Sequence, residues 1–158
     1  MNAIARPLAA PPSVPSVLHL LNEDWQTIRT LLAELGARRH WALNDADRSA
    51  LLVRLCARLY ALSRIEIELL YPRLAPEVVA AARVLHEQAA RHLHAALDAC
   101  ICQERVDDAL GPLADDIERL HACDTGRLYP ACAGLALDDM AAPMTQRRAD
   151  LLRDLFDE

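Results

Sequence analysis

Apolar residues recur along most of this chain at alternating steps of three and four positions, with polar residues between them. Such spacing places one apolar stripe along a helix that packs against other helices. We expect the first helix over residues 16–35 and further helices over residues 47–71, from Pro76 onwards, over 112–129 and over 144–156. The stripe of the first helix consists of Leu18, Leu21, Trp25, Ile28, Leu32 and Leu35.

Prolines and glycines supply the predicted boundaries. Pro72 ends the second helix, because a proline disfavours the helical conformation in the residue before it, and Pro76 suits a first helical turn. The polar residues 103–108 and the Gly111-Pro112 pair predict the next turn. Four long helices with short connections predict an all-α, up-down-up-down four-helix bundle, and we expect the short C-terminal helix to lie across one end of it.

The first fifteen residues differ from the rest of the chain. They hold four prolines and no long apolar segment, which predicts a flexible leader over residues 1–15 and a single bundle domain over residues 16–158. No apolar run approaches the roughly 20 residues of a membrane-spanning helix, so no membrane association is expected.

The amino-acid composition indicates the fold class and excludes some kinds of binding partner. Apolar residues make up 53% of the chain with only 4 glycines, a mixture that favours helices over strands. The formal net charge of −6 makes nucleic acid an unsuitable partner. Five cysteines, an odd number lying on predicted helices, indicate reduced thiols and a cytoplasmic protein.

Two segments share a pattern that points to chemistry inside the bundle. Glu66 lies six positions before Pro72, Asp124 lies six positions before Pro130, and both segments end in Leu-Tyr-Pro. In both helices the apolar stripe turns the acidic residue towards the core. A carboxylate in a core is costly unless it is paired, and facing carboxylates are how helical bundles hold metal ions.

Several side chains from different helices are expected at the same position along the axis of the bundle. Counting residues from the predicted turns puts seven positions near the middle of the bundle. This predicted central layer consists of Trp25, Leu62, Glu66, His86, Ala90, Leu120 and Asp124.

The layer resembles the metal site of the hemerythrin-like (HHE cation-binding) family, and the match runs over residues 17–148. The matching positions are Asp24-Trp25 in the first helix, Leu62, Glu66 and Tyr71-Pro72 in the second, His86 and Ala90 in the third, Leu120 or His121 with Asp124 and Tyr129-Pro130 in the fourth, and the tail from Met144 to Arg148. The resemblance implies a four-helix bundle that holds a non-haem di-iron centre through five histidines and two bridging carboxylates.

Four positions depart from that implied ligand set. Trp25, Leu62, Ala90 and Leu120 stand where the family has histidines, so we do not expect a full di-iron centre. The remaining candidate ligands are Glu66, His86, Asp124 and His121. One imidazole with two carboxylates suits a single Fe(II), Mn(II) or Zn(II) ion, and the resemblance implies binding of iron or sensing of iron, O2 or NO.

In a second interpretation the protein binds no metal. His86 pairs with Glu66, or as an imidazolium neutralises both Glu66 and Asp124, and one of the two carboxyls is protonated with a raised pKa. The bundle would then act as a regulatory or interaction protein, for instance as a homodimer. An enzyme is the third interpretation; it rests on family membership alone, and no catalytic constellation is visible, so we do not expect one.

Overall fold

The computed structural model describes residues 16–37, 45–102 and 106–156, and over these residues the chain is all-helical without a β-strand. The leader predicted over residues 1–15 lies outside the described residues. The long helices are α1 (Val17–Ala37), α2 (Asp45–Ile65), α3 (Pro76–Ile101), α4 (Val106–Cys123) and α6 (Ala141–Phe156), and a short α5 (Tyr129–Ala131) follows α4. The all-α prediction is therefore confirmed.

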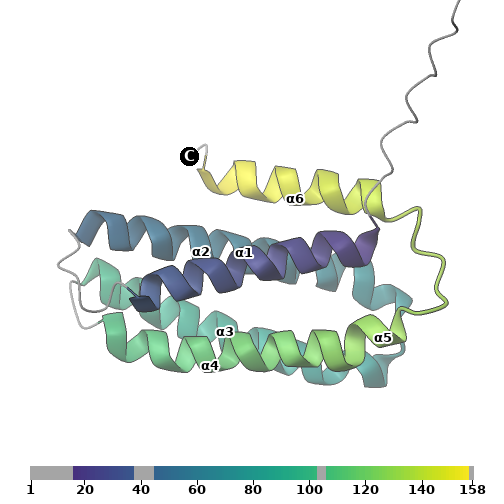
Figure 1. Cartoon of the computed structure of the whole chain (residues 1–158), viewed down its shortest axis with the longest axis horizontal. Coiled ribbons are helices and arrows are strands. Elements are labelled where there is room, and N and C mark those ends of the chain that lie inside the picture. The colour runs from purple at the N-terminus through teal and green to yellow at the C-terminus, as the bar shows by residue number, and fades with distance from the viewer. Residues whose placement is uncertain (1–15, 38–44, 103–105, 157–158) are drawn as a thin grey trace, which may run out of the picture.

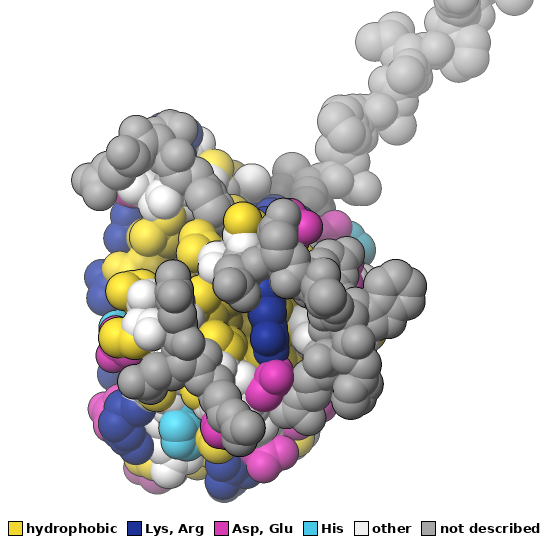
Figure 2. Space-filling model, turned by 90° about the vertical axis from the view of Figure 1, so that its left-hand side faces the viewer, with side chains coloured by type: hydrophobic (Ala, Val, Ile, Leu, Met, Phe, Trp, Pro, Cys, Tyr) yellow, Lys and Arg dark blue, Asp and Glu magenta, His cyan; other side chains and the backbone are white. Residues whose placement is uncertain are grey.

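The helices lie along one long axis. Successive helices from α1 to α4 run in opposite directions, and α1 packs on α2 while α3 packs on α4 (Figure 1). Additional contacts between α2 and α3 join the two pairs. Seen from one end, hydrophobic side chains gather between the helices and charged side chains surround them (Figure 2).

The core forms where the predicted stripes meet. Trp25, Ile28, Leu62 and Ile117, which come from three different helices, are each at most 1% exposed. Burial of such large apolar side chains is worth about 1.5–3 kcal/mol each and is the main source of stability in a helical protein of this kind.

The two segments that share the Leu-Tyr-Pro ending also share an unusual backbone. Each acidic residue opens a π-helical turn, Glu66–Leu70 after α2 and Asp124–Leu128 after α4. The amide of Tyr71 donates to the carbonyl of Glu66, and the amide of Tyr129 donates to that of Asp124. The following proline cannot donate to the helix and its ring collides with the carbonyl four residues back, so the widened turn accommodates it.

The prediction of a turn at Gly111-Pro112 was wrong. α4 begins at Val106, and Pro112 lies inside it, in the second turn. Val106 and Leu110 are buried and extend the apolar stripe of Leu113 and Ile117 towards the N-terminus. The burial of these side chains outweighs the one hydrogen bond that a proline removes from a helix.

The position of the C-terminal helix also differs from expectation. α6 begins at Ala141 and lies along α2 and α1 instead of across one end of them (Figure 1). Its buried residues Met144 and Leu151 face the core, seven positions and about two turns apart. Over the described residues, no helix is both long enough and apolar enough to cross a membrane.

Candidate functional site: a buried polar cluster beside a groove

The two acidic residues of the shared pattern lie in the core. Glu66 and Asp124 are both fully buried, each at the first position of a π-helical turn. A π turn advances the backbone by more residues per turn than an α-helix, so it rotates the following side chains out of the α-helical register. Both turns occur next to buried acids, and π turns of this kind are frequent at functional sites.

Glu66 is joined to α3 through a histidine. His86 Nε2 shares a hydrogen bond of 3.0 Å with Glu66 Oε2, and the other ring nitrogen, Nδ1, shares one of 2.7 Å with Ser63 Oγ. The imidazole is therefore held at both nitrogens, by groups that precede and begin the same π turn. The pairing of Glu66 with His86 expected under the metal-free interpretation is present.

Asp124 has a different partner. Trp25 Nε1 donates a hydrogen bond of 3.1 Å to Asp124 Oδ2, and the indole is 1% exposed. The tryptophan thus does more than fill space in the core, because its N–H satisfies one oxygen of a buried carboxyl. The ring of His121 packs against the same indole at a centroid distance of 5.1 Å in an edge-on arrangement.

Four buried polar atoms in this region have no hydrogen-bond partner. They are Oε1 of Glu66, Oδ1 of Asp124 and the hydroxyl oxygens of Tyr71 and Tyr129. The two tyrosines belong to the two Leu-Tyr-Pro endings, and the charges of Glu66 and Asp124 add to burial in raising the pKa of both hydroxyls. We call Trp25, Glu66, His86, Asp124 and the two tyrosines the polar cluster.

Burial keeps the carboxyls of the polar cluster protonated. Desolvation raises the pKa of Glu66 to about 8, and nearby hydrogen-bonding groups on Asp124 and Tyr129 only partly oppose it. Desolvation, followed by the charge of Glu66, raises the pKa of Asp124 to about 9. Both carboxyls are therefore largely neutral at pH 7, which agrees with the expectation that a carboxyl in this core carries a raised pKa.

The histidine is neutral as well. Desolvation lowers the pKa of His86 to about 4, and the guanidinium of Arg83 opposes its charging further, although Asp124 favours it. Burial thus disfavours the imidazolium between Glu66 and Asp124 that was the alternative expectation, and His86 bonds Glu66. In a dry core neutral groups cost less than three charges.

These residues can be compared with the iron centre that the resemblance implies. The cluster offers two carboxyls and one imidazole, and both nitrogens of that imidazole already bond protein atoms. Within the described part of the chain, no three side chains of His, Cys, Asp or Glu lie so that they share a metal position. A di-iron centre does not fit these donors, because it needs several imidazoles directed at one point.

The other predicted site residues are divided between core and surface. Leu62 and Leu120 are fully buried and fill their positions with apolar side chains. Ala90 is exposed, contrary to its expected place in the central layer, and its neighbour Ala89 is the buried residue. The His121 ring packs against Trp25, and burial lowers the pKa of His121.

Two buried acids escaped the sequence reasoning. Asp24 lies among Arg148 and Arg58, at 3.2 and 3.6 Å, and Asp116 pairs with His92 and Arg119. Both acids lie beside the narrow stripe of their helix, at positions that a wider apolar stripe would have included. That wider pattern is the signal that would have found them.

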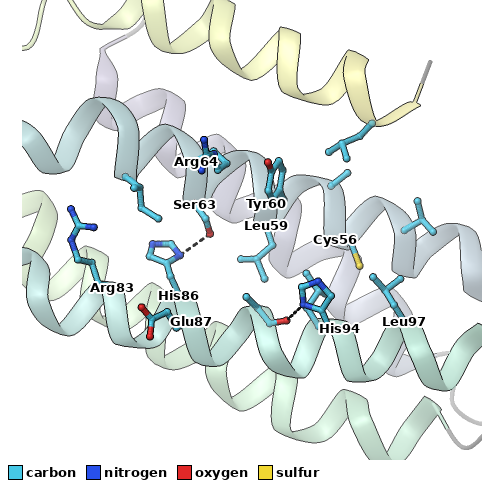
Figure 3. A pocket seen from close by; sticks show the side chains of 16 residues that line it. Cys56, Leu59, Tyr60, Ser63, Arg64, Arg83, His86, Glu87, His94 and Leu97 are labelled. Carbon is cyan, nitrogen blue, oxygen red and sulfur yellow. Dashed lines mark hydrogen bonds between the residues drawn. The ribbon is translucent and has the colours of Figure 1, made fainter. Parts of the chain in front are cut away.

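A groove runs beside the polar cluster. It lies between α2 and α3, has a volume of about 560 Å³ and reaches the Ser63–His86 hydrogen bond (Figure 3). Apolar side chains such as Leu59, Leu93 and Leu97 make up much of its lining. Volume and lining fall within the range of small-molecule sites in proteins.

Family models, curated proteins and solved structures were all compared with this chain, and none of them matches it.

Proposed function

We propose that this chain is a divergent hemerythrin-like four-helix bundle that works without an iron centre, as a regulatory or interaction protein. The observation that carries the proposal is the pairing of both core acids with protein groups, Glu66 with His86 and Asp124 with Trp25. An acid that is already bonded and protonated is a poor ligand, since metal binding requires the carboxylate.

The arrangement of the helices supports the bundle. α1 to α4 alternate in direction (Figure 1), and the polar cluster draws residues from α1, from α3 and from the segments that directly follow α2 and α4. The family's ligands come from the same four places in the chain. The spacing of the two acidic Leu-Tyr-Pro endings supports the hemerythrin-like assignment in particular.

Elemental analysis tests the absence of iron most directly. The protein is purified without an affinity tag, incubated with and without Fe(II) under anaerobic conditions, and passed through a desalting column. We expect iron, manganese and zinc well below one equivalent per chain in both samples. The matched variant Trp25→His, which restores an imidazole at the family's first ligand position, should retain more iron than the wild type.

One equivalent of metal in the wild-type protein, lost in Glu66→Ala, would contradict the metal-free proposal. It would instead establish the second candidate, a single divalent ion held by Glu66, His86 and Asp124. The two buried oxygens without partners, Glu66 Oε1 and Asp124 Oδ1, favour that candidate. An ion there would have to displace the bonds that His86 and Trp25 make to these carboxyls.

A further inference from the structure

The groove between α2 and α3 has two chemically different ends. Along α3 it extends from Arg83 to Leu97, a rise of fourteen positions, and along α2 and the following turn from Val53 to Ile67, also fourteen positions. At 1.5 Å per residue each wall is about 21 Å long. This length and the volume of about 560 Å³ suit an extended chain molecule more than a compact ring system.

Polar side chains gather at one end of the groove. Ser63, Arg64, Arg83, His86 and Glu87 line it there (Figure 3). Arg64 shares the carboxylate of Glu68 with Arg147, so these three groups together keep one positive charge.

Arg83 adds to the positive charge of this end. Its guanidinium lies 5.2 Å from the centre of the Tyr71 ring. Glu87 is the opposing charge on the same helix. With Glu68 and Glu87 counted against Arg64, Arg83 and Arg147, this end carries a net charge of +1 at pH 7.

The opposite end is mostly apolar, with His94 as a polar side chain beside Leu97, and is open to solvent (Figure 3). Leu59 and Leu93 are buried in its floor, whereas Val53, Tyr60 and Leu155 are half-exposed at its mouth. Ala90 is central to the groove: it is exposed, and its methyl group leaves open the space that a larger side chain on this turn would fill.

From this polarity we propose that the α2–α3 groove binds a single-chain amphiphile with a carboxylate head, of the fatty-acid class. The head lies at the Arg83 end, where the guanidinium supplies a positive charge beside the Ser63–His86 hydrogen bond. The alkyl chain lies along Leu59, Leu93 and Leu97, where its burial supplies most of the binding energy. This ligand deepens the proposed function, on which it rests, because it gives a bundle without iron a molecule to sense.

Titration calorimetry with decanoate, kept below its aggregation concentration, tests the proposal on the full-length protein. We expect saturable binding with one molecule per chain. Butanoate, which has the head but little chain, should bind at least tenfold more weakly, because each methylene buried contributes about 0.8 kcal/mol. Decanol, which has the chain without the charge, should also bind more weakly than decanoate.

Two exposed positions on α3 separate the contributions of chain and head. Ala90→Trp fills the middle of the groove and should weaken decanoate binding at least tenfold, whereas Ala95→Trp, on an exposed face outside the groove, should leave it unchanged. Arg83→Gln should weaken decanoate about fivefold and leave decanol unaffected, the range of a single exposed ion pair. Arg91→Gln removes the same charge outside the groove and is the matched control.

Failure of decanoate to bind, or equal binding by Ala90→Trp and the wild type, would overturn the proposal. Sedimentation of the wild type as a dimer that Ala90→Trp dissociates, without decanoate binding, would overturn it in favour of a second copy of the chain as the occupant. The metal analysis is independent of these readouts. An iron-loaded protein that binds decanoate would refute only the metal-free function, and a metal-free protein that ignores decanoate would refute only the ligand.

Discussion

At the scale of single residues, the polar cluster shows how a core tolerates two acids. Glu66 and Asp124 are fully buried, and each has one oxygen hydrogen-bonded to a side chain from another helix and one oxygen without a partner. Because burial raises the pKa of both, each carboxyl keeps its proton and no net charge is buried. Trp25 then serves as a donor to Asp124.

The substitution Trp25→Phe tests that role. Phenylalanine keeps an aromatic ring in the core but removes the N–H, so Oδ2 of Asp124 loses its donor and remains buried. We expect a loss of about 1–3 kcal/mol in the free energy of unfolding, measured by urea denaturation. Asp124→Asn is the control, because the amide still accepts from Trp25 and replaces a carboxyl that is already neutral. A larger loss in Asp124→Asn than in Trp25→Phe would contradict the assignment.

The raised carboxyl pKa values predict how stability depends on pH. The pKa of Glu66 is about 8 in the folded protein and near 4.5 when unfolded, and that of Asp124 is about 9 against 3.8. Between these limits the folded state holds protons that the unfolded state has released, so stability falls as the pH rises. His86 acts with the opposite sign, but only below its unfolded pKa of 6.5.

We therefore expect the free energy of unfolding to fall from about pH 7 to about pH 8, by up to about 1.4 kcal/mol per pH unit for each carboxyl. Glu66→Gln, which does not titrate, should show a shallower decline over the same range. Urea denaturation at intermediate pH values measures both slopes. Parallel slopes in the two proteins would show that Glu66 is not protonated in the folded state.

At the scale of elements, prolines determine where two helices end, and a buried ion pair joins α6 to α1. Pro72 and Pro130 follow π-helical turns, and each turn begins with a core acid. α6 is attached differently, through Arg148, which donates to Asp24 Oδ1 on α1 at 3.2 Å. Asp24 is 4% exposed and burial raises its pKa, against which Arg148 and Arg58 favour the charged form. The pair therefore connects α6 to the helix whose Trp25 reaches the polar cluster.

Arg148→Gln tests the attachment of α6. Removal of the guanidinium leaves Asp24 with Arg58 at 3.6 Å, so its buried charge is only partly compensated. We expect a loss of about 1–3 kcal/mol and faster amide hydrogen exchange over residues 141–156 than over α3. Arg153→Gln, which removes an exposed arginine that pairs with Asp150 within α6, should change neither quantity. Uniform acceleration in all helices would mean that Arg148 contributes to global stability alone.

At the scale of the whole molecule, the described helices enclose an apolar core. The polar cluster bonds within itself and draws on α1, α3 and the turns after α2 and α4. The α2–α3 groove lies at the surface beside this cluster, and its two ends differ in charge: one carries arginines and the other is mostly apolar. In the metal-free function that we propose, the buried polar cluster therefore has a structural role, and the α2–α3 groove at the surface binds the ligand.

Treatment of the intact protein with a chelator tests the metal-free proposal. A ligand that binds only the folded state stabilises it by mass action, so removal of a resident metal lowers the midpoint of thermal unfolding. We expect overnight dialysis against a strong chelator to leave that midpoint unchanged, as measured by circular dichroism. Dialysis followed by Fe(II) addition is the control, and a midpoint that falls and then recovers would contradict the metal-free proposal.

Several features of the fold could be predicted from the sequence because they depend on local periodicity. The stripes predicted the long helices and the inward direction of Glu66 and Asp124, which are fully buried. The start of α4 was missed because apolar burial at Val106 and Leu110 outweighs the local turn preference of Gly111-Pro112. The exposure of Ala90 was missed because the face of α3 turned to the core runs through Ala89.

By itself the sequence determined that this protein is helical and that two acids point into its interior, since both follow from the residue spacing within single helices. Only the tertiary structure decided what those acids meet. Trp25 and Asp124 are separated by 99 positions along the chain, and their hydrogen bond depends on how two helices are packed. The protonation of the cluster is likewise a tertiary property, because desolvation by surrounding helices, not residue type, raises the pKa of Glu66 and Asp124 and lowers that of His86.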